Sequence, residues 1–419
     1  MTERIRTALF RGAALLAACS VTGAVALSSP AQAQPPARAP AAPGPARSTQ
    51  ASATRGPATG PTTESPRQQA AAAALLRQAS AEPANPATVG GAQLAGSGVI
   101  VNGPAAPLPK VPASAYVVAD AGTGQVLAAK DPHGLLRPAS TLKMLTAVAL
   151  APLLNPDATV VASAQASNVT PNIAGLVRGQ AYKVSDLFYA LLLISANDAA
   201  IALAQATGSL GNGVALINAE AHHLQAYDVD AKDPNGLDVP GQHVSAYDLA
   251  LIARQALTMP DVMRYDSARE AHFPVTSRRA ETLSNQNELL TRYPGGIGGK
   301  IGWTGAAEAT YIGMARRNGV TLIVTILHCT SLTEVSYASK LLNWGFAQDD
   351  RTRPIGTLVS PLAATPAPSA KPTAPPVTSG TITGPKIPRG PAAASIALII
   401  LAAAAAIAAI LLRRRSPSR

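Results

Sequence analysis

A serine and a lysine stand three positions apart in the segment Ser140-Thr141-Leu142-Lys143. The segment opens a strongly apolar stretch of helical character, and side chains three positions apart lie on one face of a helix. A serine hydroxyl is a weak nucleophile unless a neighbouring group takes its proton. A lysine whose pKa is lowered by burial and by neighbouring charges can be that base. The segment therefore predicts a nucleophile, Ser140, activated by Lys143.

Two further polar segments follow in an order that suits the same chemistry. Ser195-Ala196-Asn197 lies about 55 residues downstream. Lys300-Ile301-Gly302 follows about 105 residues later and is continued by Trp303 and Thr304. This ordered set of a Ser-x-x-Lys tetrad, a Ser-x-Asn triplet and a Lys-x-Gly triplet is typical of penicillin-binding proteins and class A β-lactamases.

Each segment taken alone also has a purely structural explanation. Ser140 could cap a helix, and Ser195 and Asn197 could break one, since both compete for backbone hydrogen bonds. Lys300 could be a surface charge after the glycine-rich turn at residues 295–299. The common order and spacing of the three segments favour the catalytic interpretation.

The elements that must position these residues can be read from hydrophobic periodicity. A β-hairpin is expected at Ala115–Asp120 and Gln125–Ala129, around Gly122-Thr123-Gly124. The β-branched run Gly319–Cys329 predicts a central strand. Helices are expected at residues 140–153, at 184–207 with a break near Ser195, and at 213–224, 246–257 and 334–346. Strands at both ends of a helical middle predict one antiparallel sheet covered by helices.

Several blocks of the sequence resemble a known family, the serine D-alanyl-D-alanine carboxypeptidases, which are low-molecular-mass penicillin-binding proteins of the peptidase S11 type. The resemblance covers about Tyr116 to Phe346. The similar blocks are Asp120-x-x-Thr123-Gly124-x-Val126-Leu127, Arg137-Pro138-Ala139-Ser140-x-x-Lys143, Leu191-Leu192-x-x-Ser195-Ala196-Asn197-Asp198-Ala199-Ala200, Asn235-Gly236-Leu237-Asp238, Ser245-x-x-Asp248-Leu249 and Asn285-Gln286-Asn287. The resemblance implies an α/β (α+β) fold of the β-lactamase and transpeptidase type, with a five-stranded antiparallel sheet between helical clusters.

The resemblance also implies roles. Ser140 would attack the carbonyl of the penultimate D-Ala and form an acyl-enzyme, with Lys143 as proton acceptor. Lys300 would lower the pKa of Lys143 by like-charge repulsion. Ser195 would relay a proton to the departing D-Ala amine. Substrate binding would fall to Asn197, Lys300, Ile301, Gly302, Trp303 and Thr304, and the backbone N–H groups of Ser140 and Trp303 would form the oxyanion hole.

The implied substrate is a peptidoglycan stem peptide ending in D-Ala-D-Ala, and β-lactams are the implied inhibitors. No cofactor and no metal is expected. The histidines at positions 222, 223, 243 and 328 show no ligand spacing with acids. A single cysteine, Cys329, remains outside the expected signal segment, so neither a disulfide framework nor a cysteine zinc site is expected. Cys329 is expected to be a buried core thiol.

One position departs from the family pattern of Lys-Thr-Gly or Lys-Ser-Gly, because residue 301 is isoleucine. The missing hydroxyl is the one expected to bind the peptide carboxylate, and such a bond contributes about 1.5–3 kcal/mol, roughly ten- to a hundredfold in rate or affinity. We expect Thr304, on the same strand face, to compensate in part. Two hypotheses follow: an active carboxypeptidase, or a degenerate homologue that binds wall peptide or regulates a partner with little turnover. A β-lactamase and a cross-link endopeptidase remain alternatives.

The two ends of the chain predict export and a membrane anchor. Residues 1–33 have a basic start, an apolar run and the cleavage signal Ala31-Gln32-Ala33, typical of a signal peptide. A short membrane anchor, or a lipoprotein signal with acylation at Cys19, are the alternatives. Residues 392–412 are uncharged and long enough to span a bilayer, and the arginines of the tail 413–419 place that end in the cytoplasm.

Between these ends, composition divides the chain. Residues 34–95 and 354–391 are expected to be Ala/Pro-rich linkers, the first of them disordered. The folded domain is then residues 96–353, placed by the predicted topology on the cell-wall side of the membrane. The net charge of +11 comes from the ends, because residues 86–360 carry 19 basic and 20 acidic residues. A nucleic-acid reader would concentrate positive charge on its folded face, so nucleic acid is not an expected partner.

Overall fold

The computed structural model describes residues 65–78, 89–103, 106–169, 171–348 and 353–363. The signal peptide, the membrane span and the basic tail predicted from the sequence lie outside these residues. Across the described ranges, no single helix combines the length and apolar composition needed to cross a membrane. Only one bent pair, α5 (Asn197–Ala206) with α6 (Leu210–His223), meets that test when its two helices are taken together.

The centre of the fold is an antiparallel sheet. Its strands run in the order β1-β3-β2-β10-β9-β8, and β11 also pairs with β3. Their bounds are β1 Val99–Val101, β2 Ala113–Asp120, β3 Gln125–Lys130, β8 Gly296–Thr304, β9 Glu308–Arg317, β10 Val320–Cys329 and β11 Gly356–Thr357. Short β1 and β11 lie one after the other along the outer edge of β3, because they pair with residues 128–130 and 125–126 respectively. At the opposite edge, β8 has β9 as its one partner strand among the described residues.

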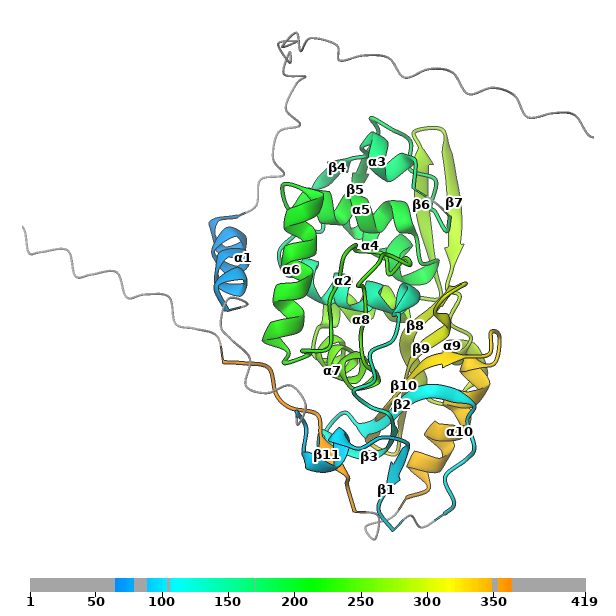
Figure 1. The fold of residues 1–419 in the computed structure, drawn as a ribbon. Helices are drawn as coiled ribbons and strands as arrows, with labels where there is room; N and C mark the ends of the chain where they lie inside the picture. Colours follow the sequence, from blue (N-terminus) through cyan, green and yellow to red (C-terminus); the bar gives the residue numbers. More distant parts are fainter. Residues whose placement is uncertain (1–64, 79–88, 104–105, 170, 349–352, 364–419) are drawn as a thin grey trace, which may run out of the picture. The chain divides into compact units, whose positions relative to one another are not determined.

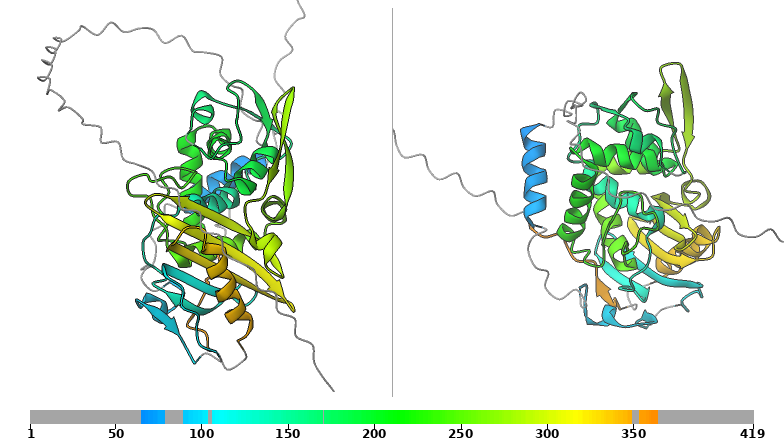
Figure 2. Two further views of the ribbon diagram at one scale, coloured as in Figure 1. Left: turned by 90° about the vertical axis from the view of Figure 1, so that its right-hand side faces the viewer. Right: turned by 45° about the horizontal axis from the view of Figure 1, so that its top comes forward.

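Apolar side chains on the two faces of the sheet form two hydrophobic clusters, as the period of two along each strand requires. Ile312 and Ile323 belong to the larger cluster, under the helices. Tyr311 and Val324 belong to the second cluster, which includes Leu341 and Leu342 of α10 (Glu334–Phe346). Figure 2 shows α10 in orange against the sheet.

Helices of the middle of the chain cover the other face (Figure 1). They are α2 Leu142–Leu150, α4 Val184–Leu193, α5, α6, α7 Ala246–Leu257 and α8 Pro260–Ser267. Every residue of α2 is buried, which explains why its sequence is apolar except at Lys143 and Thr146. This central helix packs against α4, α5, α6 and α7, and it carries the lysine of the first motif.

Smaller elements complete the described chain. They are α1 Pro66–Gln78, 3₁₀-helices η2 Ala92–Ala95 and η3 Ala139–Thr141, α3 Ala164–Ser167, α9 Leu289–Arg292, and the hairpins β4 Thr159–Val161 with β5 Ala181–Lys183 and β6 Glu270–Thr276 with β7 Arg279–Ser284. The sequence analysis did not anticipate the two hairpins, α1 or α8. The expected elements are confirmed within a few residues, and residues 246–257 and 334–346 match α7 and α10 at both ends.

Three structural predictions need correction. The sheet has seven strands rather than five, because residues flanking the family-like region add β1 and β11. The expected linker 34–95 contains α1, whose Leu75 and Leu76 pack on the core, and η2, whose Leu94 is fully buried. The expected linker 354–391 begins inside the fold. Ile355 and Leu358 are buried there and anchor β11.

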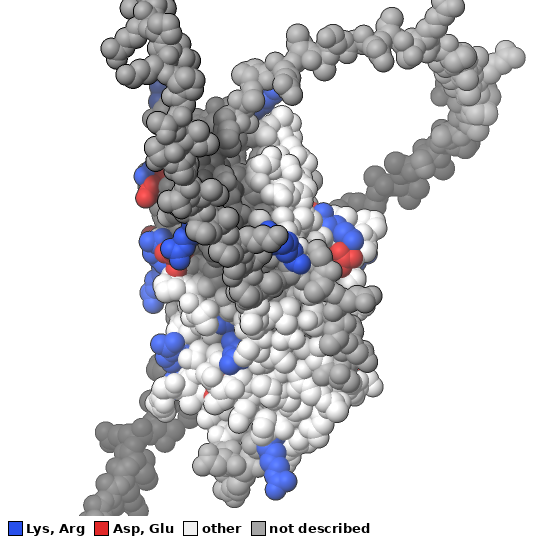
Figure 3. Space-filling model, turned by 90° about the vertical axis from the view of Figure 1, so that its left-hand side faces the viewer, with Lys and Arg blue, Asp and Glu red and all other residues white. Residues whose placement is uncertain are grey.

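Uncharged residues occupy most of the described surface on the face drawn in Figure 3, and groups of opposite charge lie next to one another at its margins. Cys329 is buried, as expected. Its pKa is raised to about 12 by burial, so the thiolate is disfavoured.

Candidate active site

The nucleophile candidate lies on a tight turn that leads into α2. Ala139 has a φ of 45°, a conformation uncommon for residues other than glycine. The carbonyl of Pro138 fixes the turn, since it accepts hydrogen bonds from Thr141 Oγ1 at 2.6 Å and from Thr310 Oγ1 of β9 at 2.8 Å. Ser140 is therefore held between the helix and the sheet.

Lys143 is in contact with Ser140, as predicted. Its side chain is fully buried, and Nζ donates to Ser140 Oγ at 2.9 Å and to the carbonyl of Asn235 at 2.8 Å. The pKa of Lys143 is lowered well below its usual range, first by burial and then by the charge of Lys300, against the opposing effects of Asp233 and Asp198. The like-charge effect of Lys300 expected from the sequence is confirmed. A lysine in this state can accept the Ser140 proton at neutral pH.

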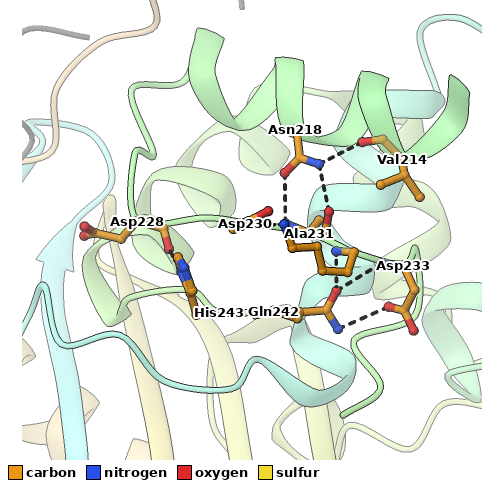
Figure 4. A network of polar contacts seen from close by, with 9 residues as sticks. Val214, Asn218, Asp228, Asp230, Ala231, Asp233, Gln242 and His243 are labelled. Carbon is orange, nitrogen blue, oxygen red and sulfur yellow. Dashed lines mark hydrogen bonds and ion pairs between the residues drawn. The ribbon is translucent and has the colours of Figure 1, made fainter. Parts of the chain in front are cut away.

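The loop between α6 and α7 presents the carbonyl that receives Lys143. Asp233 Oδ1 accepts from the backbone N–H groups of Asn235 and Gly236, at 3.0 and 2.7 Å. Gln242 bridges the loop, with Oε1 accepting from the Asp233 N–H and Nε2 donating to the Leu237 carbonyl. Figure 4 shows Gln242 and Asp233 facing each other in this network, with Asn218 of α6 holding Ala231.

Gly236 allows this loop to approach the nucleophile turn. It has a φ of 83°, and a Cβ at this position would lie 1.7 Å from the carbonyl oxygen of Ala139. The sequence analysis noted Asn235-Gly236-Leu237-Asp238 only as a family-like block. It did not foresee that a backbone carbonyl there would hold Lys143, because a carbonyl leaves no signature in residue types.

The second motif lies at the break between α4 and α5. Ser195 has a φ of 60° and is 3% exposed, and Asn197 begins α5. Within the described residues, Ser195 Oγ has no hydrogen-bond partner. The N–H of Asn197 donates to the carbonyl of Asn172 at 2.8 Å. Helix α5 packs against α2, which brings the second motif to the helix that carries the first.

The third motif lies on β8, the edge strand next to Ser140. A Cβ added to Gly302 would lie 2.7 Å from the Ser140 nitrogen, so the strand passes directly over the nucleophile turn and requires glycine there. Lys300 is buried, and Nζ donates to the Ile301 carbonyl at 2.9 Å. Burial lowers the pKa of Lys300 to about 7, and Asp266 of α8 opposes that shift.

Ile301 and Trp303 lie on the other face of β8. Ile301 pairs with Tyr311 and packs, half-buried, against the second cluster. Trp303 is 61% exposed. The expectation that Thr304 shares a strand face with Ile301 is wrong, because residues three apart point to opposite faces. The Thr304 hydroxyl is also engaged elsewhere, since it donates to Asp238 Oδ1 at 2.8 Å.

Asp238 is a second residue whose place at the site the sequence did not reveal. Its carboxylate links two parts of the site. Asp238 Oδ1 accepts the hydrogen bond from Thr304 at the end of β8, and Nη1 of Arg137, the residue before the nucleophile turn, lies 3.7 Å from the same oxygen. Both side chains of this ion pair are more than a third exposed, so its contribution to stability is small.

The structure thus brings the first and third motifs together through Lys143, Ser140 and Gly302, and places the second on the adjoining helix. This arrangement offers a hydroxyl nucleophile, a buried amine base and an edge strand of the sheet. Such an edge can pair with an extended peptide. In the described part of the chain, no group of three or more His, Cys, Asp or Glu side chains could hold a metal ion.

Comparison with known proteins identifies the family to which the chain belongs. The family model for D-alanyl-D-alanine carboxypeptidase, peptidase S11, matches residues 101–331. The chain belongs to this family. The DacB2 D-alanyl-D-alanine carboxypeptidase of Mycobacterium tuberculosis is 38% identical over 247 residues, which cover 58% of this chain and 84% of that protein. A D-alanyl-D-alanine carboxypeptidase of a Streptomyces species is 32% identical over 245 residues, covering 54% and 84%.

Solved structures of the family agree in fold. The crystal structure of a D-alanyl-D-alanine carboxypeptidase from Mycobacterium tuberculosis has a TM-score of 0.59 at 37% sequence identity. It covers 61% of this chain and 98% of that one. The match to the peptidase S11 family includes the Ser140 turn, the loop at Asn235 and strand β8, so the site described above lies wholly within the family region.

Proposed function

We propose that this protein is a serine-type D-Ala-D-Ala carboxypeptidase that removes the terminal D-alanine from peptidoglycan stem peptides. The observation that carries the proposal is the contact of Lys143 Nζ with Ser140 Oγ at 2.9 Å, made by a lysine whose pKa is lowered. This pair places a partly exposed nucleophile against its buried base. Membership of the peptidase S11 family supplies the class of substrate.

The proposed reaction follows from these residues. Ser140 Oγ attacks the carbonyl carbon of the penultimate D-Ala while its proton passes to Lys143. The backbone N–H groups of Ser140 and Trp303 stabilise the negative charge on the carbonyl oxygen. Ser195 relays a proton to the D-Ala amine as the peptide bond breaks, and water then hydrolyses the acyl-ester.

The remaining site residues are proposed to bind the substrate. The stem peptide lies along the free edge of β8, against Gly302, and Asn197 holds its amide or the base Lys143. Lys300 lies on this strand, and it is proposed to receive the terminal carboxylate. β-Lactams, which carry a similar carboxylate, acylate Ser140 by the same route.

We also propose that the domain faces the cell wall and is tethered to the membrane. The support is in the sequence: the export signal of residues 1–33 and the uncharged segment 392–412 followed by arginines. Protease accessibility of the domain in intact cells, with loss of the tether when the chain is cut after residue 391, tests this topology.

A second function, binding of wall peptide with little turnover, is favoured by one observation. Ile301 removes a hydroxyl donor from the substrate edge, and the Thr304 hydroxyl is bound to Asp238. Substrate would then dock beside an intact nucleophile that turns over slowly.

One experiment separates these functions. Full-length protein is incubated with a fluorescent penicillin and, separately, with a peptide ending in D-Ala-D-Ala, and free D-alanine is assayed. We expect the wild-type protein to be labelled and to release D-alanine. Both activities should be lost in Ser140→Ala and kept in Ser284→Ala, a control at an exposed position of β7. Labelling without release supports the binding function. Neither labelling nor release overturns the catalytic proposal.

A further inference from the structure

A buried carboxylate lies behind the Lys300 strand, outside all three sequence motifs. Asp266 belongs to α8, and its side chain is fully buried. Oδ2 accepts a hydrogen bond from the N–H of Gly299 at 2.7 Å, and Gly299 directly precedes Lys300. Oδ1 has no hydrogen-bond partner among the described residues. A buried carboxylate is costly without compensation, so Asp266 must either take up a proton or be stabilised by hydrogen bonds and a neighbouring charge.

The strand is shaped to admit this carboxylate. A Cβ at Gly298 would lie 2.2 Å from Asp266 Oδ2, so a larger residue would force the acid away. Gly299 has a φ of 132°, and a Cβ there would lie 2.0 Å from the Ile312 carbonyl oxygen. The two glycines before Lys300 therefore let β8 run close to both α8 and β9, with the acid enclosed between them.

Lys300 supplies the compensating charge. Burial raises the pKa of Asp266 to about 7, and the Gly299 hydrogen bond and the charge of Lys300 oppose that rise. Asp266 in turn raises the pKa of Lys300 against the effect of burial. The other titratable group that Asp266 affects is Tyr311 of β9, whose pKa is raised by burial and then by this acid. Helices α4 and α7 also pack on α8 but add no charge to the causes of the Asp266 shift in the described chain.

We propose that Asp266 is a positioning residue that keeps Lys300 charged beneath the substrate carboxylate, a role that rests on the proposed carboxypeptidase function. Asp266 does not touch the substrate; it acts through Lys300 and through the Gly299 N–H that fixes the start of the motif. In this chain the task carries added weight, because Ile301 leaves Lys300 without a neighbouring hydroxyl to share the carboxylate. Asp266 therefore offsets in part the loss of carboxylate binding caused by the missing hydroxyl at residue 301.

The test compares two substrates that differ only in charge. One peptide ends in D-Ala-D-Ala, and the other carries a terminal carboxamide in place of the carboxylate. Wild-type protein should prefer the carboxylate at pH 7. Asp266→Asn keeps the shape and the acceptor for Gly299, and should lower that preference about fivefold at pH 7, because a fall of about one unit in the Lys300 pKa takes its charged fraction from about a half to about a tenth. The matched control is Asp261→Asn, an exposed acid of the same helix, which should leave the preference unchanged.

A second measurement does not depend on the folding of a variant. Because Lys300 loses its proton as the pH rises through about 7, the wild-type preference for the carboxylate should fall over the same range. A preference that stays constant from about pH 5 to about pH 9 would overturn the proposal.

The outcomes separate this inference from the function on which it rests. An active wild type whose Asp266→Asn variant keeps the carboxylate preference, even with a lowered melting temperature, makes Asp266 merely structural and overturns the inference alone. A wild type that neither binds fluorescent penicillin nor releases D-alanine overturns both.

Discussion

Lys143 and Lys300 are both fully buried lysines at one site, yet their surroundings differ in kind. Lys143 lies on a helix and contacts two neutral acceptors, Ser140 Oγ and the Asn235 carbonyl, with a second cation in range. Lys300 lies on an edge strand and has a buried acid, Asp266, behind it. Burial lowers the pKa of both lysines, but the largest effect of a neighbouring charge comes from a cation for Lys143 and from an acid for Lys300.

This difference assigns opposite tasks to one residue type. Neutral acceptors and a neighbouring cation favour the uncharged amine, which is the form that a general base needs. A buried carboxylate favours the ammonium, which is the form that a carboxylate ligand needs. Both pKa values are lowered by burial, and the neighbouring charges then act on the two lysines in opposite directions, which is a difference that acid–base catalysis can use.

Replacing each lysine by methionine should show most clearly that the two lysines have different roles. Lys143→Met removes the base, so the acylation rate should fall about a thousandfold with little change in KM. Lys300→Met removes the carboxylate ligand, so KM should rise about ten- to a hundredfold and dominate the loss. Steady-state kinetics of D-alanine release checks both. If Lys143→Met acted mainly on KM, its assignment as the base would be wrong.

The loop that holds Lys143 can be tested through its glycines. Gly236→Ala drives a Cβ against the Ala139 carbonyl, so the nucleophile turn must shift, and a displacement of this kind costs about a hundredfold in rate. Gly241→Ala is the matched control, because Gly241 has the same φ of 83° in the same loop and its nearest contact would be Lys232 Cε at 3.5 Å. Penicillin labelling rates and thermal melts of the two variants supply the comparison. Equal losses in both would show that only backbone strain matters.

Substitutions at residue 301 test how the strand that carries Lys300 binds the substrate carboxylate. Ile301→Thr restores the family hydroxyl beside Lys300 and should raise kcat/KM for the peptide about ten- to a hundredfold. Ile301→Val is the control, since valine has the shape of threonine without the hydroxyl. Both variants remove a methyl group from the second cluster, so melting temperatures should fall slightly in each. A drop in activity confined to the threonine variant would mean that the site is adapted to a different ligand.

The chemistry-bearing residues could be predicted from the sequence because side-chain type and spacing identify them. Ser140, Lys143, Ser195 and Lys300 stand in motifs whose order is specific, and the structure places Lys143 against Ser140 as expected. The central elements were predictable for a similar reason. Helix α7 and strand β10 follow from apolar periodicity and from a β-branched run.

The supports of the site could not be predicted, because they depend on tertiary contacts. The Asn235 carbonyl has no sequence signature, and Asp266 stands in a short helix 34 residues before Lys300. Strand β11 is two residues long, too short for a periodic signal, and only Ile355 and Leu358 indicate that the chain there returns to the core. Ile301 and Thr304 were assigned to one strand face from proximity in sequence, and the alternation of the strand separates them.

The smallest effect predicted here is a shift in pH dependence that links the two lysines. Lys143 must be neutral to act, so activity should be present above its lowered pKa and be lost as the pH falls through that value. In Lys300→Met the like-charge repulsion is gone, so the pKa of Lys143 should rise and the acidic limb of kcat should move to higher pH. The kcat profile of the variant, measured with saturating peptide, reports this limb separately from the loss in KM. If the limb does not move, or moves to lower pH, burial alone sets the protonation of Lys143 and the two lysines are not coupled.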